Sequence, residues 1–262
     1  MFIGKPLFTG MVTVELMWER FLDSFVPKPY GSPLVDKDLT AVIKTFERPE
    51  ALKRLVKSIR RFYPFMQIVV VDDSQVPSHL EGVRTIVMPY DSGVSTGRNR
   101  ALAAVETKYM LLLDDDFVFY RKTDLEPAMK MMQMQQEIDI MGGMVVNLPL
   151  FTVTDYSRSG LHKTSASAVK EVGSTIGGLP VYDKVPNFYI GRTERLKRVG
   201  WDERIKRLDH ADFFTRAKGV LTTVFNPHFK VLHAQTPYDK SYMEKRNDDA
   251  ADRRLLYEKY YG

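Results

Sequence analysis

The sequence lacks cysteine, long apolar runs and low-complexity tracts. Without cysteine there is no disulfide framework and no thiolate metal site, which fits a reducing compartment. The longest apolar stretches, around Ile68–Val71 and Met110–Leu113, are far too short to cross a bilayer. The first residues also lack a basic region followed by an apolar stretch and a small-residue cleavage site. We therefore expect a soluble, cytoplasmic protein with no transmembrane segment.

The chain of 262 residues is long enough for one large hydrophobic core and a small additional lobe. Its hydrophobic fraction of 44% is ordinary for a globular protein and argues against wholesale disorder. The formal charge of +5 is spread along the chain and suits a phosphate-bearing ligand. A dedicated basic patch for nucleic acid is not indicated, since the lysines and arginines do not cluster.

Apolar, β-branched runs alternate with segments of helical spacing through residues 39–146. Strands are predicted at 39–46, 67–71, 84–88, 109–113 and 138–146, and helices at 51–62, 97–106 and 124–136. This alternation predicts an α/β fold with a mostly parallel central sheet and helices on both faces. Beyond it, we expect a strand at 187–193, helices at 194–199 and 210–218, strands within 220–233, a mobile polar connection at 235–250 and a helix at 249–261.

The first 37 residues read as an N-terminal arm that packs on the domain. Val14–Phe25 has the spacing of a short amphipathic helix, and the prolines and glycine of residues 27–33 predict a loop after it. A helix that docks on a membrane surface or on a partner is disfavoured here, because Glu15, Glu19 and Asp23 dilute any basic face.

Three adjacent carboxylates, Asp114, Asp115 and Asp116, follow a buried apolar strand. Like charges at such close range oppose ionisation, so the triplet needs a counter-charge. A divalent cation supplies it, and carboxylate oxygens are ligands that Mg²⁺ and Mn²⁺ prefer. In open α/β sheets ligands bind beyond the carboxyl ends of the strands, where Thr45-Phe46 and Asp72-Asp73 are also predicted to lie. The alternative is a solvated turn in which Asp115 caps a helix.

Two further segments suit a nucleotide. One carboxylate of Asp72-Asp73 could accept the uracil N3–H or a ribose hydroxyl, although such a pair is also typical of a turn or a helix N-cap. Gly97-Arg98-Asn99 opens a predicted helix after Gly93, so backbone N–H groups and a guanidinium could meet phosphate. The same three residues could also simply start the helix.

The second half of the chain offers candidates for acceptor chemistry. On a helix Asp209, Asp212 and Arg216 share one face, so an Asp212–Arg216 ion pair is a plain alternative to a catalytic role. His210 points elsewhere and suits a general base, because its ordinary pKa lies near neutrality. His233 ends a predicted strand and is a candidate metal ligand, or a structural histidine.

With these residues laid out, the chain resembles a family 2-type glycosyltransferase of the GT-A fold, over about residues 39–234. Within that family it looks most like the ganglioside β-1,4-N-acetylgalactosaminyltransferase type. The segments that carry the resemblance are Lys44-Thr-Phe-Glu-Arg-Pro49, Ser58-Ile-Arg-Arg-Phe-Tyr-Pro64, Val71-Asp-Asp-Ser74, Gly97-Arg-Asn99, Thr107-Lys-Tyr109, Leu113-Asp-Asp-Asp-Phe-Val-Phe119, Gly142-Gly143, Val185-Pro-Asn-Phe-Tyr-Ile-Gly-Arg-Thr193, Val199-Gly-Trp-Asp202 and His210-Ala-Asp-Phe-Phe214.

The resemblance implies a UDP-sugar donor, Mn²⁺ or Mg²⁺, and inversion at the anomeric carbon. It divides the chain into the arm at 1–37, a nucleotide-sugar-binding half at 38–146, an acceptor-binding and catalytic half at 147–234, and a C-terminal tail and helix at 235–262. The implied donor-site residues are Thr45, Phe46, Arg48, Asp72, Asp73, Gly97, Arg98, Asn99, Asp114 and Asp115. The implied metal ligands are Asp114, Asp116 and His233, and the acceptor-side residues are Asp209 and Trp201.

The chain departs from the family pattern at one important position. Many members carry Glu-Asp where this chain has Asp209-His210, and the aspartate of that pair is usually the catalytic base. The base therefore stays open among Asp209, His210 and Asp212, with Asp212 and His210 favoured.

The donor sugar and the acceptor are not determined by the sequence. The donor is GalNAc, GlcNAc, glucose or galactose, and the acceptor a glycan, a glycolipid, a protein or a modified nucleic-acid base. The membrane anchor of the animal enzymes lies outside the resemblance, which suggests a bacterial or viral relative. Two alternative functions remain. A sugar nucleotidylyltransferase shares the architecture, but its glycine-rich activation loop is missing here, and a non-catalytic glycan- or partner-binding module would keep the same site.

Overall fold

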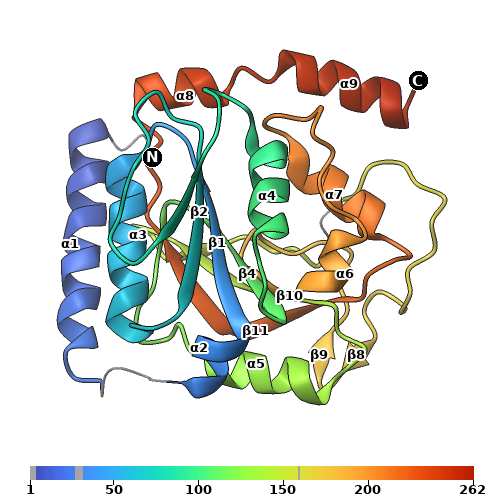
Figure 1. Ribbon diagram of the computed structural model, residues 1–262, viewed down its shortest axis with the longest axis horizontal. Coiled ribbons are helices and arrows are strands. Elements are labelled where there is room, and N and C mark those ends of the chain that lie inside the picture. Colours follow the sequence, from blue (N-terminus) through green and yellow to red (C-terminus); the bar gives the residue numbers. More distant parts are fainter. Residues whose placement is uncertain (1–3, 27–31, 159) are drawn as a thin grey trace.

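A nine-stranded sheet forms the centre of the molecule, within residues 4–26, 32–158 and 160–262 that the computed structural model describes. Its strand order is β3-β2-β1-β4-β10-β6-β11-β5, with β7 paired to β6 (Figure 1). The strands are β1 (Leu39–Thr45), β2 (Gln67–Asp72), β3 (Arg84–Val87), β4 (Tyr109–Asp114), β5 (Phe117–Val118), β6 (Ile140–Asn147), β7 (Thr152–Val153), β10 (Tyr189–Arg192) and β11 (Thr223–His233). A separate small hairpin joins β8 (Thr175–Ile176) to β9 (Leu179–Pro180).

The first four strands of the sheet are parallel, as the alternating pattern predicts. The sheet becomes mixed beyond β4, because β10 enters between β4 and β6 and runs antiparallel to both. One sheet therefore contains strands from both predicted halves of the chain. The parallel register brings the carboxyl ends of β1, β2 and β4 to the same edge, where Thr45 pairs with Asp72 and Lys44 with Asp114.

Helices cover both faces of the sheet (Figure 1). They are α1 (Lys5–Asp23), α2 (Pro33–Asp38), α3 (Pro49–Phe62), α4 (Val94–Ala103), α5 (Leu125–Met134), α6 (Thr193–Lys197), α7 (Asp209–Ala217), α8 (Lys240–Arg246) and α9 (Ala250–Tyr260). Since successive side chains of a strand point to opposite faces, Ala41 and Ile43 of β1 pack in the core with α3 and α5, and Val42 packs in the core with α4, α6 and α7. None of the helices in the described ranges is long and apolar enough to cross a membrane.

The N-terminal arm and the tail differ in detail from the prediction. Helix α1 begins at Lys5, nine residues before the predicted start, because its first turns also pack apolar side chains such as Phe8 and Val12 on the domain. The connection predicted to be mobile contains helix α8, whose first turn is capped by the Asp239 carboxylate. The loop predicted at 27–33 falls mostly on residues 27–31, which lie outside the described residues.

Candidate active site

A cleft lies at the carboxyl ends of β1 and β4, close to helix α8. Eight of the predicted site residues line it, namely Phe46, Arg48, Arg98, Asp114, Asp115, Asp116, Asp209 and His233. Its other lining residues are Lys44, Val94, Asn187, Lys206, Arg207, Tyr242 and Arg246. The cleft therefore joins the aspartate triplet to a surplus of basic side chains.

Arg48 supplies the counter-charge that the aspartate triplet requires. Its Nη1 donates to Asp115 Oδ1 at 2.6 Å and its Nη2 to Asp116 Oδ2 at 2.9 Å, and all three side chains are buried. Thr45 Oγ1 donates to the second oxygen of Asp115 at 2.8 Å. Burial raises the pKa of Asp115 above its usual range, and Arg48 opposes this rise. Asp115 is thus occupied by protein donors.

Asp116 faces His233 as well as Arg48. The His233 Nε2 atom lies 3.2 Å from Asp116 Oδ2. Burial acts to raise the pKa of Asp116, but His233 and Arg48 together hold it far below its usual range. The other ring nitrogen of His233, Nδ1, lies 2.8 Å from Asn147 Oδ1 and 3.2 Å from Gln235 Nε2. The carboxylate at Asp116 is therefore ionised and stands next to an imidazole nitrogen.

This pair fits a divalent cation, since ligating histidines usually donate their other N–H to a carbonyl or carboxylate. The third predicted ligand is Asp114, whose Oδ1 instead accepts a hydrogen bond from Arg98 Nη2 at 2.9 Å. No group of three His, Cys, Asp or Glu side chains placed to hold a metal occurs in the described ranges. Mg²⁺ typically takes one or two protein carboxylates and completes its shell with substrate phosphate and water. Asp116 and His233 suit that kind of site.

Arg98 joins the two halves of the cleft. Its guanidinium, 3% exposed, contacts Asp114 at the end of β4 through Nη2 and Asp209 at the start of α7 through Nη1. Burial raises the pKa of Asp209, and the nearby Arg98 charge opposes this rise. The side chain that is predicted to meet phosphate therefore connects the carboxylate at the end of β4 with the carboxylate at the start of α7.

Asp72 and Asp73 are fully buried beneath the cleft and do not line it. Asp72 accepts hydrogen bonds from the backbone N–H groups of Ser74 and Ser78, at 2.9 and 2.8 Å. Asp73 contacts Lys44 Nζ and accepts from Gly93 N at 3.0 Å. In the structure both carboxylates hold the loops beside the cleft, and a uridine contact through them stays a prediction.

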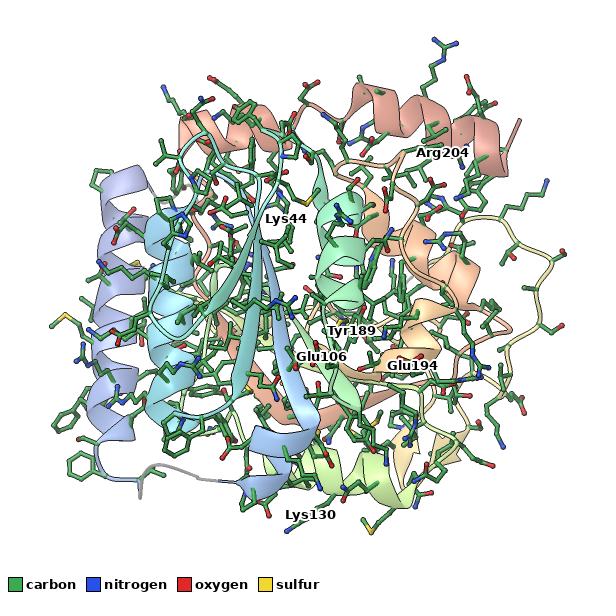
Figure 2. The ribbon with its side chains drawn as sticks, in the orientation of Figure 1. Lys44, Glu106, Lys130, Tyr189, Glu194 and Arg204 are labelled. Carbon is green, nitrogen blue, oxygen red and sulfur yellow. The ribbon has the colours of Figure 1, made fainter. Side chains whose placement is uncertain are left out.

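Gly97 and Asn99 also make structural contacts inside the protein and do not line the cleft. Lys44 lies beside α4 (Figure 2). A Cβ on Gly97 of that helix would lie 2.6 Å from Lys44 Cγ. The Asn99 amide donates to Trp201 O at 2.9 Å and accepts from Trp201 N at 2.8 Å. Trp201 itself is buried and stacks on Phe213. None of these three predicted residues lines the cleft.

The three candidates for the base occupy different surroundings. Asp209 lines the cleft beside Arg98. Asp212 forms the predicted ion pair with Arg216, at 2.8 Å, and also accepts from Lys259 Nζ and Tyr260 Oη of α9, at 2.6 and 2.7 Å. His210 Nε2 lies 2.7 Å from Val185 O, and burial lowers the pKa of His210 to about 3. The imidazole is therefore neutral, with its proton on Nε2.

A comparison with protein families identifies the family to which the chain belongs. The Glycosyl transferase family 2 profile matches residues 40–200, a stretch that carries β1, β4, the aspartate triplet and Arg98. The chain belongs to glycosyltransferase family 2.

Relatives in that family and solved structures agree with this assignment. The chain is 36% identical over 194 residues to human beta-1,4 N-acetylgalactosaminyltransferase 1, covering 70% of this chain and 36% of that protein. It is 35% identical over 243 residues to the mouse beta-1,4 N-acetylgalactosaminyltransferase 2, covering 86% of this chain and 47% of that protein. The chain thus spans between about a third and a half of the length of these relatives.

The fold is also that of solved structures. The S. aureus TarS fragment 1-349 matches with a TM-score of 0.58 at 17% identity, over 75% of this chain and 60% of that one. The same fragment in complex with UDP-GlcNAc matches with a TM-score of 0.56 at 16% identity, over 84% and 65%. At such identities the likeness concerns the fold, and it confirms the predicted GT-A architecture.

The sequence did not identify seven residues that line the cleft. They are Lys44 of β1, Val94 of α4, Asn187, Lys206 and Arg207 of two loops, and Tyr242 and Arg246 of α8. Lys206 and Arg207 are placed by Asp252 of α9, which accepts from the backbone N–H groups of residues 206, 207 and 208 at 3.1, 2.6 and 2.9 Å. Tyr242 of α8 stacks over the Arg48 guanidinium, with 4.3 Å from its ring centroid to Arg48 Cζ. Only the basic character of Lys206-Arg207 was visible in the sequence, because their partners lie about 40 residues further on.

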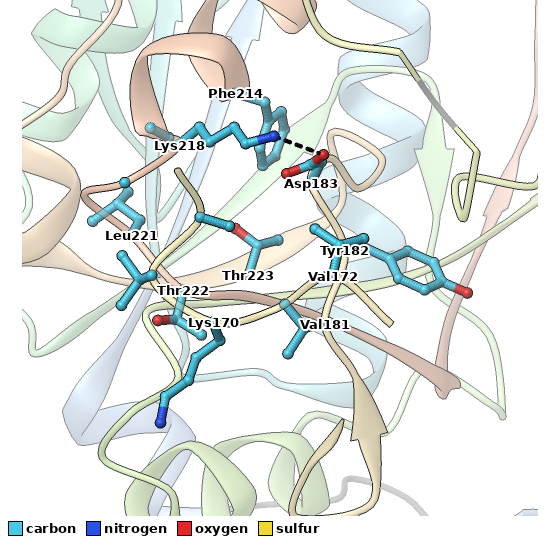
Figure 3. Close-up of a pocket in the computed structure, with 14 residues that line it drawn as sticks. Lys170, Val172, Val181, Tyr182, Asp183, Phe214, Lys218, Leu221, Thr222 and Thr223 are labelled. Atoms are coloured by element: carbon cyan, nitrogen blue, oxygen red, sulfur yellow. Dashed lines mark hydrogen bonds and ion pairs between the residues drawn. The ribbon is translucent and has the colours of Figure 1, made fainter. Parts of the chain in front are cut away.

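A second hollow lies away from the cleft, beside β9 and α7. It is lined by residues 168–172, 181–183, 214–219 and 221–223 in part, and the Asp183–Lys218 ion pair closes it at 3.3 Å (Figure 3). Its volume of about 20 Å³ has room for about one water molecule. This hollow is therefore too small to hold a sugar.

Proposed function

We propose that the chain transfers a sugar from a UDP-sugar to an acceptor hydroxyl, with inversion at the anomeric carbon and with Mn²⁺ or Mg²⁺. One observation carries the proposal: the aspartate triplet at the end of β4 lines a cleft together with several basic side chains, namely Arg48, Arg98, Lys206, Arg207 and Arg246. Such a set of cations is suited to a diphosphate, which the ionised Asp116 would otherwise repel. The names of the relatives and the TarS–UDP-GlcNAc complex support an N-acetylhexosamine donor.

In the proposed reaction the acceptor oxygen attacks the anomeric carbon from the face opposite the diphosphate. A carbon–oxygen bond to the acceptor forms, the bond to the diphosphate oxygen breaks, and UDP leaves with the electron pair. The basic side chains of the cleft stabilise the negative charge that develops on the diphosphate. A divalent ion held by Asp116 and His233 would supply further electrophilic stabilisation of that leaving group.

We assign the acceptor proton to His210. The contact with Val185 O orients the imidazole, and the second ring nitrogen is then the free lone pair. Asp212 is already bound by three donors, and Asp209 by Arg98, so neither is as free to take a proton. His210 also occupies the register in which many family members carry the aspartate base.

The function is tested by a screen of UDP-sugars for metal-dependent release of UDP. We expect UDP-GalNAc or UDP-GlcNAc to be consumed in the presence of Mn²⁺ or Mg²⁺, and EDTA to stop the release. Each donor is also ranked by the rise in melting temperature that it causes. Formation of a nucleotide sugar from NTP and a sugar phosphate would instead identify a nucleotidylyltransferase, and tight UDP binding without any turnover would identify a binding module.

The role of His210 is tested by three variants. We expect His210→Ala to lower kcat at least about a hundredfold, and His210→Asp to retain more activity because it restores the common family base. Since the pKa of His210 is lowered to about 3, wild-type kcat/KM should show no loss near the ordinary histidine pKa as the pH falls to about 5. A fully active His210→Ala variant, together with an inactive Asp209→Asn variant, would transfer the role to Asp209.

A further inference from the structure

Helix α1 presents a row of large apolar side chains to solvent. Leu7, Val14, Met17, Trp18 and Phe21 of this helix, and Phe25 just beyond it, are each more than half exposed. Their spacing of three, four and seven residues places them along one side of the helix. Trp18 stacks on Phe21 and Phe21 packs edge-on against Phe25, with ring centroids 5.5 and 5.0 Å apart. An exposed apolar stripe of this size is unusual for a surface helix and marks a binding face.

The other side of α1 is fastened to the domain, so the stripe cannot turn inward. Val12 is buried in a small core with Leu148 and Leu232, and Phe8 packs on Tyr238. Glu19 forms an ion pair with Arg121 and is only 7% exposed. Because α1 lies at the outer edge of the molecule beside α3, its free side faces away from the sheet (Figure 1).

The acidic residues that disfavour a membrane role in the sequence do not lie on the exposed stripe. Asp23, like Glu19, is buried, and its Oδ1 accepts from Arg121 N at 2.9 Å while its Oδ2 lies 3.5 Å from Arg61. Of the three acids, only Glu15 keeps part of its surface in solvent. The carboxylates of Glu19 and Asp23 therefore point toward the protein and not toward the exposed stripe.

Basic side chains border the stripe. A groove of about 750 Å³ runs between α1 and α3, and its lining includes Met17 from the stripe together with Arg20, Lys53, Lys57 and Arg61. Arg20, Lys53 and Lys57 are exposed, whereas Glu19 and Asp23, which also line the groove, are buried in ion pairs with Arg121 and Arg61. Glu50 is the one exposed acid on its rim among the described lining residues. A cationic border beside an aromatic and aliphatic face is complementary to an anionic lipid surface.

We propose that the solvent-facing stripe of α1, with the basic edge of α3, docks the protein on an anionic phospholipid bilayer. The helix lies in the plane of the interface, since it is not apolar enough to span the membrane. Trp18 and the two phenylalanines enter the boundary between headgroups and acyl chains, and Lys53 and Lys57 remain at the level of the phosphates. This docking is independent of which sugar the cleft transfers.

The chain carries its own reporter for this proposal. It has two tryptophans, of which Trp201 is 5% exposed in the core and Trp18 is 54% exposed on the stripe. Vesicles of phosphatidylcholine with phosphatidylglycerol should shift the emission of Trp18 to the blue, and brominated acyl chains should quench it. Trp18→Phe should keep vesicle binding and lose both optical signals. Binding should weaken in high salt and be at least about tenfold weaker to pure phosphatidylcholine.

Vesicle flotation of variants tests whether the exposed stripe of α1 is the surface that binds the bilayer. We expect Trp18→Ser/Phe21→Ser/Phe25→Ser to lose flotation at least about tenfold, with unchanged melting temperature and UDP release. Met134→Ser/Tyr257→Ser is the matched control, because both residues are equally exposed but lie on α5 and α9. Wild type that stays unbound, or a triple variant that floats as wild type does, overturns the proposal. A dimer that the triple variant dissociates, without any vesicle binding, would make the stripe a protein interface instead.

Discussion

Asp116→Asn should reduce sugar transfer by about a hundredfold to a thousandfold and leave the fold intact. The amide keeps the shape of the carboxylate but carries no charge, so it can neither ligate a cation well nor hold His233 as the carboxylate does. Arg48 retains Asp115 at 2.6 Å, which limits the structural cost of the change. Turnover is measured as UDP release with Mn²⁺ present, and folding by circular dichroism and thermal melting.

The control for this variant is Asp155→Asn, since Asp155 is a fully exposed aspartate outside the cleft. We expect the control to keep wild-type turnover. Calorimetry of UDP binding with and without Mn²⁺ separates the two parts of the hypothesis, because the metal-dependent gain in affinity should disappear in Asp116→Asn. Wild-type activity that persists in EDTA would refute the metal, and full activity of Asp116→Asn would refute the residue.

Arg98→Leu should destabilise the fold by about 3–5 kcal/mol, the cost of removing one partner from a buried ion pair. The substitution leaves Asp209, 4% exposed, without its cation, and frees Asp114 at the opposite wall of the cleft. For a domain of this size the melting temperature should fall by about 10 °C. Activity should also be lost, because Asp114 at the end of β4 and Asp209 at the start of α7 are no longer joined. Chemical denaturation monitored by fluorescence measures the change.

Two comparisons make the Arg98 result specific. Arg204→Leu removes one of the two cationic partners of Asp202, the other being Lys259, at a site where the arginine side chain is 65% exposed, and should lower the melting temperature far less than Arg98→Leu does. Arg98→Leu/Asp209→Leu removes both charges and should recover part of the lost stability without restoring transfer. Equal losses in Arg98→Leu and Arg204→Leu would show that the buried pair does not stabilise the fold.

The sheet was predictable because its signals are local. Each of the five strands predicted within residues 39–146 is a short apolar run, and each helix between them has one apolar side, as in Leu52, Leu55 and Ile59 of α3. The position of the aspartate triplet follows from the end of β4 in the same way. Strand β10 shows where local reasoning ends, because nothing within residues 187–193 indicates that it inserts antiparallel between β4 and β6.

The roles of individual site residues depended on contacts that are distant in sequence. Arg48 was expected to bind the nucleotide, and the structure shows that it also compensates Asp115 and Asp116, which lie 67 and 68 residues away. The side of α1 that packs on the domain could not be predicted from the sequence either. Because both of its sides carry apolar residues, the pattern alone does not tell which side holds Glu19 and Asp23 against the domain.

Because Asp252 holds the backbone of residues 206–208, the cleft is completed only late in the synthesis of the chain. The family-matched region ends at residue 200, and it contains the aspartate triplet, Arg48 and Arg98. The backbone of residues 206–208 is held by a carboxylate 44 to 46 positions later, and Arg48 is covered by Tyr242, which lies 194 positions further along the chain. A nascent chain therefore exposes a charged, unfinished cleft until residues 240–260 have left the ribosome. If the cleft binds the donor as proposed, a chain that ends near residue 235 should keep every strand of the sheet and lose the contacts of Tyr242 and Asp252 that complete the cleft.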